Sequence, residues 1–209
     1  MHQNLMLNIR ELKQKGDIYK NTFYSNRIKL LIIGIFLAGL WLGTMLVIKN
    51  GYINNFIKNG INYLINSDYI KTLKVIAVLN SGAIFAVFIS GFSACGLVTS
   101  IGLPCIYGII CGAANSYIYS NYKLNGVFFT LIIIIPFAVV TTLLITALSD
   151  GAVNLTKKVI KSLAFGEAGK RGEVKLYFYT GGIVIIVECI LALLQSFLVT
   201  KIGLLILNL

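Results

Sequence analysis

The stretch Tyr107 to Ser120, YGIICGAANSYIYS, combines closely spaced glycines with cysteines, which are residue types of several functional sites. A phosphate-binding loop is excluded, because that motif ends in Gly-Lys-Ser or Gly-Lys-Thr and no lysine follows these glycines. No metal site is predicted either, because the chain has no C-x-x-C pair and its single histidine is His2. We interpret the cysteines as small packing residues. They all lie in apolar runs, at Cys95, Cys105, Cys111 and Cys189.

Small residues recur at every fourth position in this stretch, and a second such series occurs in the preceding apolar run. In lipid, a small-xxx-small series lets two helix backbones approach closely and drives their association. We therefore expect two neighbouring antiparallel helices to pack on each other through these ridges. Pairing between two copies of the chain, which would form a homo-oligomer, is the alternative. The ridges are Gly82, Ala86, Ser90 and Ala94, and Gly108, Gly112, Ser116 and Ser120.

Glu188 is an acidic residue near the centre of an apolar run, with no lysine or arginine at matching depth. Ionisable residues inside a membrane are functional candidates by default. One interpretation is a hydrogen-bonded glutamate that fixes helix register, with Asn80 and Asn115 as candidate partners. The other is a proton or ion relay, which is less favoured because no chain of charged partners accompanies this residue.

Catalytic residues are not predicted anywhere in the chain. Hydrolytic or nucleophilic chemistry needs a positioned base or a pair of carboxylates. The sequence has one histidine, at its N-terminal end, and few acidic residues outside the apolar runs. We therefore expect a protein that is not an enzyme and that needs no cofactor or metal.

The composition indicates an integral membrane protein. Of the 209 residues, 57% are hydrophobic and only 12% are charged, whereas soluble proteins carry about 25% charged residues. The net charge of +11 comes largely from clusters at the ends of apolar runs. Such clusters are typical of topology signals and contacts with anionic lipids. Without an aromatic-basic platform, they do not indicate nucleic-acid binding.

Apolar runs long enough to cross a hydrocarbon core of about 30 Å predict an all-α, polytopic membrane helix bundle of about five transmembrane helices. A basic tail, residues 1–27, precedes a membrane domain at 28–209. The excess of basic residues in the tail and in the last loop places the N-terminus in the cytoplasm and the C-terminus outside it. The spans are expected near 28–48, 73–95, 99–120, 127–148 and 176–200.

Two prolines and one glycine mark expected irregularities. Pro104 is placed in the first turns of the third span, where a missing N–H costs little. A polar turn that ends at Gly126 connects the third and fourth spans, and Pro136 should kink the fourth. The basic segment 149–175 is expected to be a loop with a short amphipathic helix, LTKKVIKSL.

Residues 51–72 carry isoleucines at helical spacing between asparagines and lysines, which is typical of a helix lying on the membrane surface. This segment is interpreted either as an interfacial element or as a surface that docks a partner. In the second interpretation, Ile53, Ile57 and Ile61 would be the contact residues.

The centre of the chain resembles the stage II sporulation protein M (SpoIIM) family of endospore-forming bacteria. The similarity rests on GLVTSIGLPCIYGIICG at 96–112, on LNG ending at Gly126 and on Pro136 ten residues later. It extends over roughly 28–200 in organisation but only about 92–140 in motif. The sequence departs from the family at Val98, where proline is expected, and at Gln195, where an acidic residue is usual.

The resemblance implies a non-catalytic scaffold in the bacterial cytoplasmic membrane, at the sporulation septum. Such a scaffold recruits two extracytoplasmic cell-wall hydrolases during engulfment, an amidase/endopeptidase and a lytic transglycosylase. The alternative from the residues themselves is the membrane subunit of a transporter or permease, with a cytoplasmic ATPase as partner and Glu188 on the substrate path. Membrane lipid is a partner in both cases.

Overall fold

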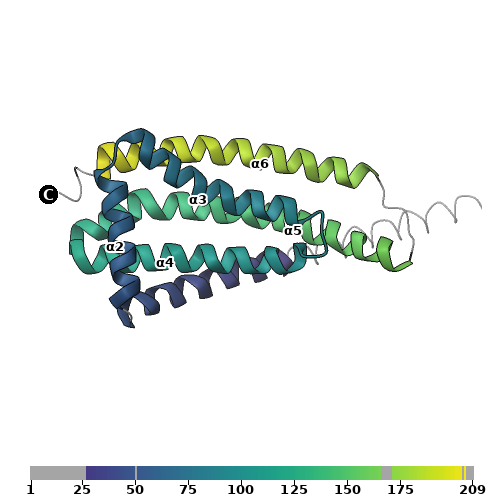
Figure 1. Ribbon diagram of the computed structural model, residues 1–209, viewed down its shortest axis with the longest axis horizontal. Helices are drawn as coiled ribbons and strands as arrows, with labels where there is room; N and C mark the ends of the chain where they lie inside the picture. The colour runs from purple at the N-terminus through teal and green to yellow at the C-terminus, as the bar shows by residue number, and fades with distance from the viewer. Residues whose placement is uncertain (1–26, 50, 166–170, 204, 206–209) are drawn as a thin grey trace, which may run out of the picture.

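The computed structural model describes residues 27–49, 51–165, 171–203 and 205, and that part of the chain is helical, without strands. A first helix, Arg27–Lys49, is followed by seven further elements (Figure 1). These are α2 (Gly51–Asn66), α3 (Tyr69–Ser90), α4 (Gly96–Phe129), the π-helical turn η1 (Thr130–Ile134), α5 (Ile135–Phe165), α6 (Arg171–Leu198) and a second π-helical turn, η2 (Val199–Gly203).

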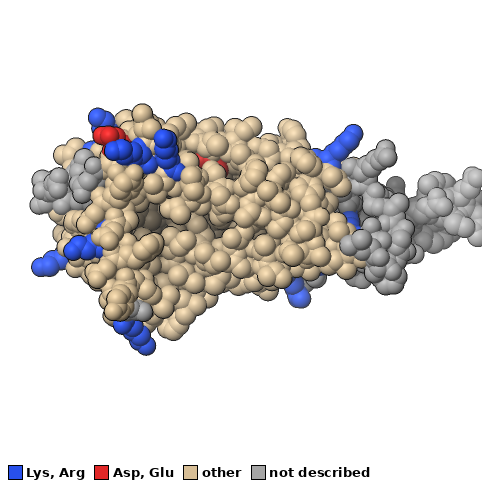
Figure 2. Space-filling model, viewed as in Figure 1, with Lys and Arg blue, Asp and Glu red and all other residues tan. Residues whose placement is uncertain are grey.

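Within the described residues, four helices are long and apolar enough to cross a membrane. They are Arg27–Lys49, Tyr69–Ser90, Gly96–Ile160 and Val174–Gly203. Their outer faces are covered with exposed aliphatic side chains, such as Leu131 and Ile186. Lysine and arginine gather at the two ends of the molecule, and the surface between them is almost uncharged (Figure 2). These features indicate a multi-pass membrane protein.

The 65-residue segment Gly96–Ile160 is not one straight helix, because the chain reverses direction at Lys123. This residue has φ 48° and ψ −123°, which is outside the helical region. A Cβ added at Gly126 would lie 2.5 Å from the carbonyl oxygen of Ile118, whereas residues eight apart in a straight helix are about 12 Å apart. The two arms therefore run side by side (Figure 1), and the predicted polar turn at 121–126 is confirmed.

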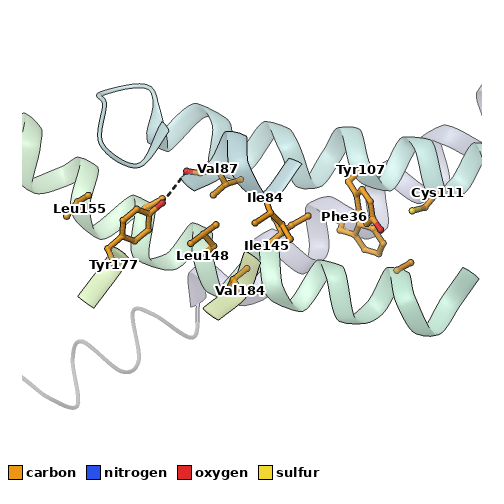
Figure 3. Packing of buried hydrophobic residues seen from close by; sticks show 12 residues of the cluster. Phe36, Ile84, Val87, Tyr107, Cys111, Ile145, Leu148, Leu155, Tyr177 and Val184 are labelled. Carbon is orange, nitrogen blue, oxygen red and sulfur yellow. Dashed lines mark hydrogen bonds between the residues drawn. The ribbon is translucent and has the colours of Figure 1, made fainter. Parts of the chain in front are cut away.

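A second tight reversal, at 91–95, joins α3 to α4. Side chains from the last two long helices bond to the backbone of this turn and of the last turn of α3. Tyr177 Oη donates to the carbonyl oxygen of Val87 at 3.2 Å, as Figure 3 shows. Thr156 Oγ1 donates to the carbonyl oxygen of Ser93 at 3.1 Å. The reversal separates the spans that were expected near 73–95 and 99–120, and α3 both begins and ends earlier than expected.

Two predictions about helix irregularity need correction. Pro104 does not lie in the first turns of its helix: α4 begins at Gly96, so Pro104 is an interior residue, buried, with helical backbone angles around it. The segment expected to be a basic loop from residue 149 onward is instead the continuation of α5, which is helical as far as Phe165. Near Pro136, the predicted irregularity takes the form of the π-helical turn η1, which ends two residues before it, since proline cannot donate the regular backbone bond.

The amphipathic helix α2 lies across one end of the bundle, transverse to the long helices (Figure 1). Its apolar side contributes to a core cluster in which Ile61 is buried against side chains such as Ile76, Tyr117 and Val199. The other core cluster lies further along the bundle and contains Phe36, which stacks on Tyr107 with ring centroids 6.1 Å apart (Figure 3).

Candidate functional site: a buried polar cluster beside a cavity

Glu188 lies on α6, inside the bundle, and its side chain is fully buried. Thr141 from α5 faces it, and Thr141 Oγ1 lies 3.2 Å from each carboxyl oxygen. The ion pairs of Lys29 with Asp150 and of Lys71 with Asp68 do not involve Glu188. The carboxyl group is therefore held by hydrogen bonds between neighbouring helices.

Amide side chains extend this cluster toward α3. Asn80 is buried, lies close enough to interact with the Glu188 carboxyl, and donates from Nδ2 to Gln195 Oε1 at 3.3 Å. Asn80, one of the two expected partners of Glu188, thus lies near the carboxyl group, and its hydrogen bond goes to Gln195. Asn115 behaves differently: its Oδ1 is buried with no hydrogen-bond partner among the described residues, so the same expectation is not met there.

Tyr107 connects the cluster to α4. It is buried, and its hydroxyl group lies near the side chains of Thr141 and Cys111. Glu188, Thr141, Tyr107, Asn80 and Gln195 thus form one polar group contributed by α3, α4, α5 and α6. A lone carboxyl with hydroxyl and amide neighbours can fix helix register, or bind and release a proton.

A cavity of about 340 Å³ lies beside this cluster. Its wall is mainly aliphatic, but Asn80, Tyr107, Cys111 and Gln195 also line it. Its outer rim carries residues exposed on the bundle surface, including Leu79 on α3 and Ile106 on α4. Figure 2 shows the surface hollowed between these two helices, next to α2. The cavity therefore opens sideways, toward the surface that we assign to lipid.

The two small-residue ridges do not pack on each other as predicted. A Cβ at Gly108 would meet the backbone of Leu40, and a Cβ at Gly112 would lie 2.8 Å from the carbonyl carbon of Leu40. The partner of the α4 ridge is thus the helix Arg27–Lys49, which presents its own glycines: a Cβ at Gly39 would lie 2.5 Å from the carbonyl oxygen of Cys105.

The α3 ridge has no helix partner of this kind. A Cβ at Gly82 would meet no atom within 4 Å, because this residue lines the cavity. Ala86 and Ala94 are exposed, and Ala94 lies in the 91–95 turn. Ser90 is buried at the end of α3 and donates to the carbonyl oxygen of Val87, while Ser116 is buried in α4. Of the four residues of this ridge, Gly82 alone lines the cavity, and none of them forms a close contact with α4 of the kind predicted.

The three isoleucines predicted to dock a partner point toward the bundle. Ile61 is buried, and Ile53 and Ile57 pack against the same core cluster, so none of them can provide the contact surface. The outward face of α2 instead carries Tyr52, 89% exposed, and Phe56, 80% exposed. Tyr52 and Phe56 are four residues apart, which places them on one face of a helix. The isoleucines have a similar spacing and are more numerous, so they dominated the prediction.

Other members of the site gave weak signals in the sequence. Thr141 lies in a run of threonines and valines in which a hydroxyl group facing Glu188 cannot be told from one facing lipid. Tyr107 is the first residue of the glycine-rich stretch, and nothing in that pattern indicates that its hydroxyl group faces Thr141. The four cysteines are free thiols, of which Cys111 is buried and Cys95 and Cys189 are exposed.

Comparisons of the chain with protein-family models, with curated proteins and with solved structures give no match.

Proposed function

We propose that this protein is a non-catalytic membrane scaffold that recruits a peptidoglycan-degrading enzyme through the outward face of α2. The role is the one implied by the SpoIIM-like motif at 96–112. The contact surface consists of the aromatic residues on the outward face of α2 and not of its isoleucines. The single observation that supports it is the exposure of Tyr52 and Phe56 on a helix that lies across the end of the bundle.

The proposal includes a topology of five membrane crossings. The reversal at Lys123 divides Gly96–Ile160 into two antiparallel arms, and each arm is long enough to cross on its own. An odd number of crossings puts the two ends of the chain on opposite sides. Because the N-terminal tail and the segment 149–175 are rich in lysine and arginine, the positive-inside rule assigns their side to the cytoplasm. The end with α2 is then extracytoplasmic, where cell-wall enzymes act.

An exposed aromatic pair on a rigid helix is a suitable anchor for a protein partner, because aromatic residues dominate binding energy at interfaces. Tyr63, half exposed on the same helix, extends this face. The inward isoleucines hold α2 against the bundle, which fixes the direction in which the aromatic rings point. The helix therefore needs little ordering when a partner binds.

Crosslinking and pull-down from native membranes test the proposal. The variant Tyr52→Ser/Phe56→Ser should lower recovery of a cell-wall amidase or lytic transglycosylase by about tenfold or more, because losing an aromatic anchor costs about 2 kcal/mol or more. The control, Leu176→Ser/Tyr179→Ser, removes two similarly exposed side chains from the start of α6, near the opposite end, and should recover the hydrolase normally. Equal recovery with both variants would contradict the proposal.

The second candidate is the membrane subunit of a transporter, favoured by the position of Glu188 beside a cavity. The variant Glu188→Gln keeps the shape and an oxygen that Thr141 can bond, but it cannot ionise. A scaffold should tolerate this change, with unchanged membrane localisation and hydrolase recovery. A proton-coupled carrier should lose pH-gradient-driven uptake in reconstituted vesicles. Normal uptake by the variant would remove this second candidate.

A further inference from the structure

The cavity between α3 and α4 is accessible from the lipid-facing side of the bundle. Leu79 is 48% exposed and Ile106 is 54% exposed, and both belong to the cavity rim. The α2 residues Ile61 and Leu64 close the cavity toward the end of the bundle. A molecule dissolved in the membrane can thus reach the cavity without passing through water.

The size and lining of the cavity suit a hydrocarbon ligand. Its volume of about 340 Å³ lies at the lower end of the range for ligand pockets, about 300–1,000 Å³. Aliphatic side chains form most of the wall, and ordered water is stable in a cavity only where several polar partners surround it. An apolar chain is therefore the better occupant for most of this space.

One part of the wall is polar, and its groups retain hydrogen-bonding capacity. Asn80 and Gln195 share one bond, of 3.3 Å, but each primary amide has two donor hydrogens and an acceptor oxygen. Both residues line the cavity, together with Tyr107. A ligand oxygen near this pair can accept from an amide N–H or donate to an amide oxygen. A purely aliphatic occupant gains neither interaction.

We propose that this cavity binds a membrane lipid that enters sideways between α3 and α4, with its hydrocarbon chain against the aliphatic wall and one hydrogen-bonding oxygen at the Asn80–Gln195 pair. This assignment is independent of the scaffold role, since it concerns a different surface from the outward face of α2. It also explains why the packing around Gly82 is open, because a larger side chain at this position would occupy the entrance of the cavity.

The first test uses the purified full-length protein in phospholipid nanodiscs. The probe is a long-chain fatty alcohol with a photoreactive diazirine in its chain and a terminal alkyne. After irradiation, peptides from α3 and α4 that line the cavity should carry the label. An unlabelled alcohol should compete better than an alkane of equal length, and Asn80→Leu should abolish that preference.

Two glycine variants decide whether the label reports the cavity. At both Gly82 and Gly182, an added Cβ meets no atom within 4 Å, but only Gly82 lines the cavity. Gly82→Phe should reduce labelling of cavity peptides about tenfold, while Gly182→Phe should leave it unchanged. Equal labelling in the two variants, or labelling confined to the outer surface of the bundle, would overturn the proposal.

A second measurement does not depend on how Gly82→Phe folds. In a variant that retains only Cys111, added fatty alcohol should slow the reaction of this thiol with N-ethylmaleimide at least severalfold, since Cys111 lines the cavity. A permanently charged methanethiosulfonate reagent should not react. Rapid reaction with the charged reagent would mean a water-filled path, which overturns the lipid assignment and favours the transporter candidate. A negative result in either test would contradict lipid binding but not the scaffold role, because the hydrolase pull-down reports on a different surface of the protein.

Discussion

At Gly112, the backbone of α4 lies directly against the backbone of Leu40 in the helix Arg27–Lys49. Gly108 and Gly39 make similar contacts one turn along, so the two backbones stay close over more than one contact point. This backbone-to-backbone contact is the form of packing that small-residue series provide in lipid, where van der Waals contacts drive helix association.

We expect Gly112→Val to destabilise the protein by about 1–3 kcal/mol or more, the typical cost of forcing extra methyl groups into a filled site. Thermal unfolding in detergent, followed by circular dichroism, measures the change. The matched control is Gly182→Val, which adds the same atoms where nothing lies within 4 Å. Equal melting temperatures for the two variants would show that the first helix does not pack on α4 as described.

The spacing of the glycines was sufficient to predict that α4 packs closely on another helix, but not which helix. A four-residue series defines a face and contains no information about its partner. The same limit applies to Glu188: its burial followed from its place in an apolar run, but the sequence offered both Asn80 and Asn115 as partners and did not separate them. Thr141 and Tyr107 depend on how α4 and α5 rotate about their axes, which the sequence pattern leaves open.

Among the helical elements, the turn at Lys123 stores conformational strain. Its φ of 48° is the only positive φ of a non-glycine residue in the described part of the chain. Backbone angles of this kind cost about 1–3 kcal/mol for a residue with a Cβ. Glycine adopts them readily.

Lys123→Gly should therefore stabilise the protein by about 1 kcal/mol. The measurement is the melting temperature in detergent, which should rise. The neighbouring substitution Leu124→Gly is the control, since it introduces the same flexibility without relieving a positive φ, and it should be neutral or destabilising. A lower melting temperature for Lys123→Gly than for the wild type would contradict the strained turn.

Helix α2 shows what periodicity can and cannot predict about an element. The isoleucine spacing correctly indicated an amphipathic helix at a surface. The prediction that the isoleucine face points outward was wrong. Both faces carry apolar residues, and a sequence pattern does not distinguish a protein core from a lipid headgroup region. The decision depends on the shape of the bundle end, where Tyr117 and Val199 form a floor for the isoleucines.

For the whole molecule, the proposed five crossings predict which positions share a side of the membrane. In a background without native cysteines, Lys58→Cys on α2 and Lys123→Cys at the turn should react with a membrane-impermeant maleimide on intact cells. Lys158→Cys near the far end of α5 should react only after lysis. Reaction of all three positions on intact cells would contradict the topology. The control is total labelling after detergent treatment, which should be equal for the three variants.

The extension of α5 has a mechanical consequence. The helix passes the ion pair between Asp150 and Lys29, of 4.0 Å, and continues to Phe165, which adds about 22 Å at 1.5 Å per residue. The same helix contributes Ala138 to the cavity wall. Because α5 is continuous from Ile135 to Phe165, a displacement of its far end would be transmitted along the helix toward the cavity. The π-helical turn η1, Thr130–Ile134, lies next to the opposite end of this helix.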